Sequence, residues 1–167
     1  RLTLFGIELA SGPIVLPCEF GQLASLQTLF LGDLFLWGTS DTSVSWPAAS
    51  CFNKGLPQLK HLRLENVAAL TVPSTLLASP RLQAIEVRGD RPVSVPELPP
   101  AFDELQVLVL RDCGVGGELP SFANSALRRI DVRHNSLKGG EPNYFDNCSQ
   151  LLEAQLDNNL LDTDVFY

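Results

Sequence analysis

The string Leu127-Arg-Arg-Ile130-Asp-Val132-Arg-His-Asn135-Ser-Leu137 decides the fold, because its spacing returns along the whole chain. Apolar residues occupy its first, fourth, sixth and eleventh positions. Counterparts begin at five other leucines: Leu26, Leu59, Leu82, Leu105 and Leu151. Leu2-Thr-Leu4-Phe-Gly-Ile7-Glu-Leu9 fits as a copy without its first position. The starts lie 22 to 24 residues apart, with one step of 33, and such a period is typical of a solenoid in which each copy forms one turn.

The centre of each copy reads as a short β-strand. In an apolar-x-apolar pattern the side chains alternate across the strand, so the apolar pair points inward and the residues between face outward. Stacked copies then predict a parallel sheet with strands about 4.8 Å apart. Prolines such as Pro96 and Pro120 disfavour a regular helix in the second halves, which predicts extended, polyproline-like or short 3₁₀ segments. A doubly wound fold is disfavoured, because the segments between copies lack a sustained helical stripe.

Two segments carry a family resemblance. Gly117-Glu-Leu-Pro120-Ser-Phe and Asp146-Asn-Cys-Ser-Gln-Leu151 resemble the plant-type, extracellular subclass of the leucine-rich repeat family. The resemblance implies an α/β solenoid: a right-handed superhelix with a parallel β-sheet on its concave face and irregular or 3₁₀ return segments. It also implies a non-catalytic module at the cell surface or outside the cell, which recognises a protein, peptide or glycan through the concave strands. Asn135 and Asn159 resemble the asparagine-ladder positions of the family, whose side chains satisfy backbone groups between turns.

The repeats predict a single domain over residues 1–167, with about seven turns and an insertion at 37–46. Repeat arrays need atypical terminal copies to shield the last apolar layer, and neither end shows a polar cap. We therefore expect a fragment of a longer array, with further repeats or subunits covering both ends.

Charge separates the predicted strands from the rest of the chain. A formal net charge of −7 and a pI near 4.7 argue against a nucleic-acid partner, and no apolar run approaches the ~18 residues of a membrane span. The segments 59–67, 82–90, 105–113 and 127–135, however, hold seven basic and five acidic residues, against five basic and fourteen acidic residues elsewhere. The composition therefore predicts a slightly basic central face on an acidic protein.

An outward column of three arginines, Arg88, Arg111 and Arg133, is the main candidate binding feature. The planar guanidinium fork suits carboxylate, sulfate or phosphate, which points to an acidic ligand. The predicted ligand-binding residues are Arg63, Arg88, Arg111, Arg129, Arg133 and His134. In the alternative interpretation, nearby carboxylates hold these arginines in a solvated lattice of ion pairs that contributes little to binding: Glu65, Glu86, Asp112 and Asp131.

Aromatic residues near the N-terminus are candidate partner contacts. They are Phe5 and Phe30 on predicted strands, and Trp37 and Trp46 in the insertion. Exposed aromatic residues are common interface anchors, although the tryptophans would equally well fold back and cover the longer turn. This surface also motivates a rival function: a structural subunit packed permanently into a larger assembly or cell-surface matrix.

The cysteines and one sequon suggest covalent features. Cys18 and Cys51 each lie eight residues before the leucine that opens the next copy, so equal registers on adjacent turns make them a disulfide candidate, with two buried thiols as the alternative. Cys113 and Cys148 differ in register and read as small core residues. Asn147 opens the sequon Asn-Cys-Ser and is either a glycosylation site or a turn residue.

The sequence carries no motif for catalysis, a metal or a cofactor. The two histidines, His61 and His134, belong to different columns about three turns apart, which places them roughly 15 Å from each other. They therefore cannot share a metal ion or a proton. Phosphate loops, His-Glu-x-x-His and Cys-x-x-Cys are absent from the sequence, and the prediction is a protein that is not an enzyme.

Overall fold

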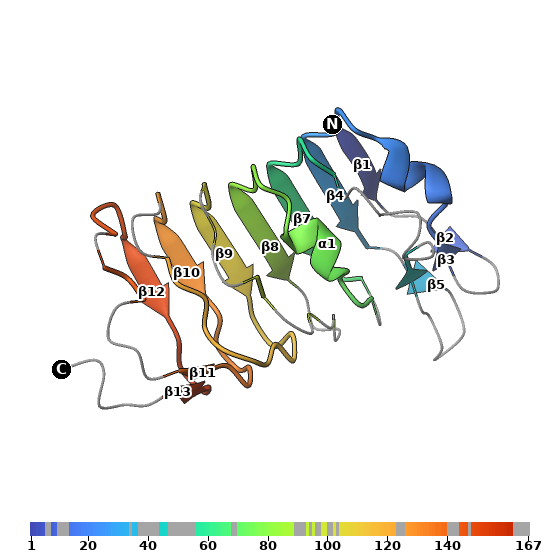
Figure 1. Cartoon of the computed structure of the whole chain (residues 1–167). Coiled ribbons are helices and arrows are strands. Elements are labelled where there is room, and N and C mark those ends of the chain that lie inside the picture. Colours follow the sequence, from blue (N-terminus) through green and yellow to red (C-terminus); the bar gives the residue numbers. More distant parts are fainter. Residues whose placement is uncertain are drawn as a thin grey trace.

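Parallel strands stacked in chain order form the main sheet of the computed structural model (Figure 1). The structure describes residues 1–5, 8–9, 14–33, 35–36, 44–46, 56–67, 70–88, 93, 95, 98–99, 102, 104–122, 126–139, 144–146 and 148–161. Within these residues the main sheet has seven strands: β1 (Leu2–Phe5), β4 (Thr28–Gly32), β7 (His61–Glu65), β8 (Ala84–Arg88), β9 (Val107–Leu110), β10 (Arg129–Asp131) and β12 (Glu153–Gln155). Each strand lies in one copy of the sequence repeat.

Equivalent positions of successive copies are paired across the sheet. Leu29 of β4 pairs with Leu62 of β7, and Leu62 pairs with Ile85 of β8. Along β7 the inward Leu62 and Leu64 are buried, whereas Arg63 between them is exposed. The parallel solenoid that the alternating pattern predicts is therefore confirmed.

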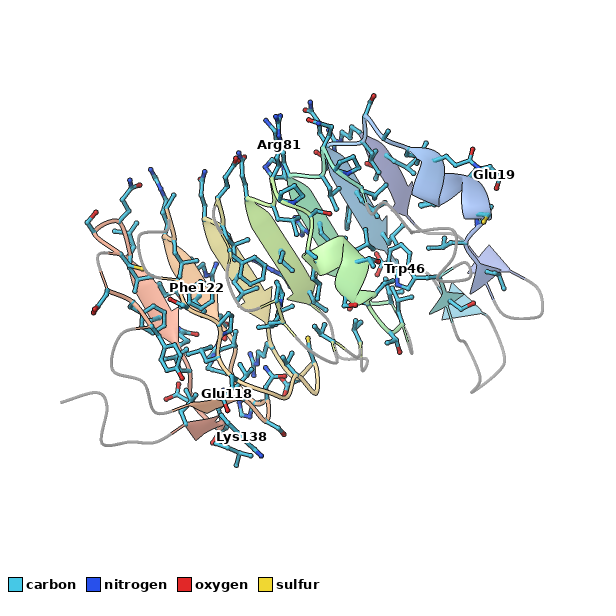
Figure 2. All side chains as sticks on the ribbon, in the orientation of Figure 1. Glu19, Trp46, Arg81, Glu118, Phe122 and Lys138 are labelled. Atoms are coloured by element: carbon cyan, nitrogen blue, oxygen red, sulfur yellow. The ribbon has the colours of Figure 1, made fainter. Side chains whose placement is uncertain are left out.

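The core fills the space between the main sheet and the return segments. Inward residues of the strands, such as Leu62 and Ile130, are almost fully buried. From the return side, the ring of Phe122 lies between those of Phe102 and Phe145, with centroid distances of 6.1 and 5.8 Å and nearly parallel planes. Figure 2 shows Phe122 among the side chains between the strands and the return segments. The three stacked rings connect the cores of successive turns, and a single turn could not bury such a ring on its own.

The return segments are mostly irregular, as the prolines predict. Among the described residues they contain one 3₁₀ helix, η1 (Cys18–Gln22), and one turn of α-helix, α1 (Ser74–Leu77). The α-helical turn departs from the expected extended or 3₁₀ geometry. It is tolerated because Pro73 lies at its N-cap, where the missing N–H costs no helical hydrogen bond, and because Leu76 and Leu77 enter the core.

Short parallel ladders join neighbouring return segments. They pair β2 (Glu8–Leu9) with β5 (Phe35–Leu36), β3 (Ile14–Val15) with β6 (Val44–Ser45), and β11 (Lys138–Gly139) with β13 (Leu160–Leu161). Glu118 adds an isolated bridge to Lys138, and Figure 2 shows both side chains at the edge that carries β11 and β13. We call β11 and β13 the Lys138 ladder.

A column of left-handed residues follows the strands of the main sheet. Its described members have φ between 48° and 57°: Asp33, Asn66, Asp112, His134 and Asn158. Asn, Asp and His enter this region more readily than other non-glycine residues. The N–H of Asp33 donates to the carbonyl of Glu65 on the next turn, and the N–H of Asn66 donates to that of Arg88. The column therefore ties successive turns together just beyond the strand ends.

The predicted asparagine ladder is present at the two positions that carry it. Asn135 Oδ1 accepts hydrogen bonds from the backbone N–H groups of Cys113 (3.1 Å) and Val115 (3.0 Å), and Nδ2 donates to the carbonyl of Leu110 (2.6 Å). Asn159 Oδ1 accepts from Leu137 N–H at 3.1 Å. Each side chain thus satisfies backbone groups of the preceding turn.

Candidate functional site

The side of the main sheet that faces away from the core presents columns of side chains, and we call it the open face. One column follows the register of the strands through Thr3, Phe30, Arg63, Glu86, Val109, Asp131 and Gln155. The same column follows from the sequence repeat alone. A second column begins Phe5, Gly32, Glu65 and Arg88. Arg111, directly after β9, and Arg133, two residues after the end of β10, continue it.

A hollow of about 570 Å³ lies on the open face over β8, β9 and β10. Arg88, Arg111, Arg129 and Arg133 line it together with Val109 and Asp131, and we call it the arginine hollow. Four of the six predicted ligand-binding residues thus meet in one place. Val109 and Asp131 are both 4% exposed although their column points outward, so they form the floor beneath the longer side chains.

Ion pairs hold the arginines of the open face. Arg88 Nη2 lies 2.6 Å from Glu86 Oε2, and Arg129 Nε lies 3.0 Å from Glu153 Oε2. These contacts show that the lattice of ion pairs weighed as the alternative interpretation is present. Exposed pairs of this kind contribute little to stability, and they leave nitrogen atoms of the guanidinium groups in contact with solvent.

The pair between Arg133 and Asp131 is the most enclosed. Arg133 Nε donates to Asp131 Oδ1 and Nη2 donates to Oδ2, both at 2.9 Å, and the Asp131 side chain is only 6% exposed. The hydrogen bond from Arg133 holds the pKa of Asp131 below its ordinary value, and the charges of Arg133 and Arg111 act in the same direction. Asp131 is therefore an ionised carboxylate that fixes the guanidinium of Arg133 against the floor.

The pair between Arg111 and Asp112 is open to solvent. Arg111 Nε lies 3.2 Å from Asp112 Oδ2, and both side chains are more than half exposed. Asp112 belongs to the left-handed column, so its backbone turns where β9 ends and places the carboxylate beside the arginine. This ion pair is therefore far easier to exchange than that of Arg133.

A second hollow of about 480 Å³ adjoins the first over β4, β7 and β8. Phe30 and Arg63 line it, with the guanidinium carbon of Arg63 5.1 Å from the centroid of the Phe30 ring. The predicted partner contact Phe30 is consequently half-buried beneath an arginine, and Arg63 itself also pairs with Glu65 at 2.8 Å. We call this the Phe30 hollow.

Other predicted site residues lie elsewhere. His134 belongs to the left-handed column, where its Nδ1 lies 3.3 Å from Asn158 Nδ2, and it does not line the arginine hollow. Trp46 packs against the hydrophobic core, as in the alternative in which it covers the longer turn. The Phe5 backbone belongs to β1, but its side chain lies outside the described part of the structure, as does the whole of Trp37.

The cysteines and the sequon are only partly described. Cys18 opens η1 and is disulfide-bonded, but its predicted partner Cys51 lies outside the described residues, so the pairing of these two stays a prediction. Asn147 also lies outside them. Cys113 and Cys148 are in no disulfide bond; the first is buried and the second is half-buried against the core. Burial and the charge of Asp112 raise the pKa of Cys113 to about 12.

The floor of the arginine hollow is what sequence reasoning missed. Val109 stands in an outward column, and the signal in the sequence is its apolar side chain between Glu86 and Asp131 of the same column. The sequence also carries a signal for the left-handed column, since the eighth position of each full copy from Leu26 onward is Asp, Asn, Gly or His.

Within the described residues, no cluster of three or more His, Cys, Asp or Glu is placed to hold a metal ion. No helix of that part is long and apolar enough to cross a membrane.

One repeat of the sequence matches a known family, and one solved structure is similar to the chain. Residues 126–148 match the Leucine Rich Repeat family model. A structure of the plant peptide hormone receptor RGFR1 in complex with RGF2 is similar to this chain at 18% sequence identity, with a TM-score of 0.47. That match covers 93% of this chain and 32% of the receptor chain, so the chain spans about a third of the receptor's length. No curated protein matches the sequence significantly. Residues 126–148 are therefore similar to the Leucine Rich Repeat family, within a chain whose repeats build a parallel solenoid.

Proposed function

We propose that this leucine-rich repeat domain is a non-catalytic recognition module that binds an extended, acidic segment of a protein or peptide across its open face. The observation that carries the proposal is the arginine hollow, in which four guanidinium groups surround a floor made by Val109 and Asp131. Convergent, partly solvated arginines suit carboxylate recognition.

The shape of the open face supports an extended ligand. The Phe30 hollow and the arginine hollow adjoin each other, and together they extend from β4 to β10. Five strands about 4.8 Å apart span about 19 Å, which an extended peptide covers with about six residues. The face therefore suits a short linear segment better than a small molecule, because neither hollow is the enclosed apolar cavity that small ligands prefer.

Charge supports an acidic ligand. The four central strand segments carry a small excess of basic residues, whereas the remainder of the chain is strongly acidic. An acidic segment is attracted to the first surface and repelled by the second, which directs it to the open face. We expect this binding to weaken as salt rises.

The rival function as a permanently packed structural subunit has less support in the described residues. It requires an apolar surface at the N-terminal turns, yet Phe30 lies beneath Arg63 and Trp46 packs against the protein's own core. The recognition module requires an accessible polar face, which the arginines provide.

The wider setting follows from the resemblance and is part of the proposal. We place the domain outside the cell or at its surface, with residues 1–167 as one leucine-rich repeat domain. A disulfide between Cys18 and Cys51 and a glycan on Asn147 fit that setting.

Peptide selection tests this proposal. A random 12-residue peptide library is selected on the immobilised chain, and enriched peptides are synthesised and measured by biolayer interferometry. We expect acidic peptides to be enriched, and Arg111→Glu to weaken their binding at least tenfold, because it reverses an exposed charge in the arginine hollow. The same interferometry measurement with oligogalacturonate, an acidic glycan, compares its binding to the natural chain and to the same variants.

Lys138→Glu is the matched control, since it reverses one exposed charge in the Lys138 ladder, away from the open face. We expect it to change peptide affinity by less than twofold. The proposal fails if no peptide is enriched, if Arg111→Glu leaves the affinity unchanged, or if only the glycan binds with this dependence.

A further inference from the structure

The arginines of the arginine hollow differ in how much of each guanidinium is already occupied. Arg133 presents both Nε and Nη2 to the two carboxylate oxygens of Asp131, and its side chain is 28% exposed. A ligand that took this guanidinium would leave the buried Asp131 carboxylate unpaired, at a large cost. Arg133 is therefore a fixed wall of the hollow and not a group that a ligand captures.

Arg111 and Arg88 are in the opposite state. Among the described residues, the side chain of Arg111 makes one polar contact, from Nε to the exposed Asp112, and its terminal nitrogens make none. The side chain of Arg88 makes one as well, from Nη2 to Glu86. Their side chains are 54% and 43% exposed. Each guanidinium therefore has N–H groups that face solvent.

These two arginines act on the same space. Arg88 ends β8, and Arg111 follows β9, the neighbouring strand about 4.8 Å away. Both line the arginine hollow, beside Val109 of its floor. A ligand carboxylate held in the hollow therefore lies between the two guanidinium groups.

We propose that Arg88 and Arg111 form a clamp for one glutamate or aspartate carboxylate of the bound segment, and that Asp112 is a built-in competitor which this carboxylate displaces from Arg111. This inference rests on the proposed function and assigns its residues. Binding exchanges one ion pair for another without covalent change. The pair between Arg111 and Asp112 is exposed and weak. The ligand carboxylate replaces Asp112 because it binds Arg88 at the same time.

The clamp makes opposite predictions for neighbouring residues. We measure fluorescence anisotropy at low salt with a tetramethylrhodamine-labelled (Ala-Glu)₄ peptide and its (Ala-Gln)₄ twin. Arg88→Gln and Arg111→Gln should each weaken binding of the glutamate peptide about tenfold, since each removes a charge-assisted hydrogen bond. Asp112→Asn should strengthen it about threefold or more, because the internal competitor is gone. The glutamine twin should bind at least tenfold more weakly than the glutamate peptide.

Arg81→Gln is the matched control. Arg81 is an exposed arginine just before β8, hydrogen-bonded to Gln58, and Figure 2 shows it at the ends of the strands opposite to the Lys138 ladder. It does not line the arginine hollow. The same loss of charge there should change affinity less than twofold. Thermal unfolding shows whether each variant is folded. If Arg88→Gln or Arg111→Gln does not fold, Arg88→Lys or Arg111→Lys takes its place, since lysine keeps the charge but loses the guanidinium fork.

Three results overturn the clamp. The first is that Arg81→Gln weakens binding as much as Arg111→Gln does, which would mean diffuse attraction. The second is that Asp112→Asn fails to strengthen binding. The third is that inorganic phosphate at equal ionic strength displaces the probe as well as unlabelled (Ala-Glu)₄ does. If the clamp fails while display-selected peptides still depend on Arg111, the proposed function stands and only the clamp is lost. If neither probe nor selected peptides bind the open face, both fail.

Discussion

Arg133 donates two hydrogen bonds of 2.9 Å to Asp131, the residue two places before it, and buries that carboxylate beneath its own guanidinium. The pair converts an outward position of β10 into part of a closed floor. Arg133 differs in this respect from Arg88 and Arg111, whose ion pairs are exposed to solvent. A column that looks uniform in the sequence is therefore divided into a structural arginine and two that remain accessible.

Replacing Asp131 by asparagine should lower the melting temperature in a manner that depends on pH. The native pKa of Asp131 is depressed, mainly by the hydrogen bond from Arg133. A depressed native pKa stabilises the fold above the ordinary carboxyl value of 3.8, and this contribution is lost as pH falls through the native value. Asp131→Asn should therefore melt several degrees below the natural chain at pH 7, and the difference should close in strong acid. Circular dichroism melts from pH 7 to pH 2 measure it, and a gap that is constant with pH would contradict the account.

Asn135→Ala should destabilise the chain by about 2–4 kcal/mol, because it leaves several partly buried backbone groups without partners. Asn135 serves two N–H groups and the carbonyl of Leu110 on the preceding turn. Gln150→Ala, which removes an exposed acceptor of Arg128, should cost less than about 0.5 kcal/mol. Urea unfolding compares the two, and equal midpoints would show that the asparagine ladder does not support the turns.

Phe122→Ala should cost about 3–5 kcal/mol, since Phe122 is fully buried between two other rings. Phe145 is only half-buried at the end of this stack, so Phe145→Ala should cost less. Phe122→Leu, which keeps most of the volume, should recover much of the loss. Urea midpoints of the three variants give the order, and a larger loss for Phe145→Ala than for Phe122→Ala would contradict the packing described.

Cys113 should resist alkylation in the native protein. Burial raises its pKa to about 12, so the reactive thiolate is scarce at pH 8 and iodoacetamide has little access. Peptide mapping by mass spectrometry should find Cys113 unmodified in native protein and fully modified in urea. Modification of the native thiol at the rate seen in urea would show that this turn is open in solution.

The sequence predicted the sheet because one repeated alternation specifies both strand and register. The pairing of Phe30 with Arg63, and of Arg63 with Glu86, follows from counting positions in each copy. The helical turn α1 was not predicted from the sequence. A proline such as Pro73 prevents a helix that would contain it, but it permits a helix that begins directly after it.

The sequence names the arginines of the arginine hollow and carboxylates near them, but not which carboxylate each arginine takes. An arginine side chain is long enough to reach carboxylates on its own strand or on the next. Arg133 pairs with Asp131 on its own chain segment, whereas Arg129 pairs across to Glu153 of β12. Val109, although it stands in an outward column, is buried beside these arginines in the arginine hollow. Sequence position alone does not determine which carboxylate each arginine takes.

Backbone amide NMR with a peptide selected on this chain tests the central claim most directly. If the open face is the recognition surface, amide shifts should concentrate in residues 84–88, 107–110 and 129–131, the strands beneath the arginine hollow, and should be absent from Arg111→Glu. Shifts confined to the Lys138 ladder, or unchanged by Arg111→Glu, would contradict it.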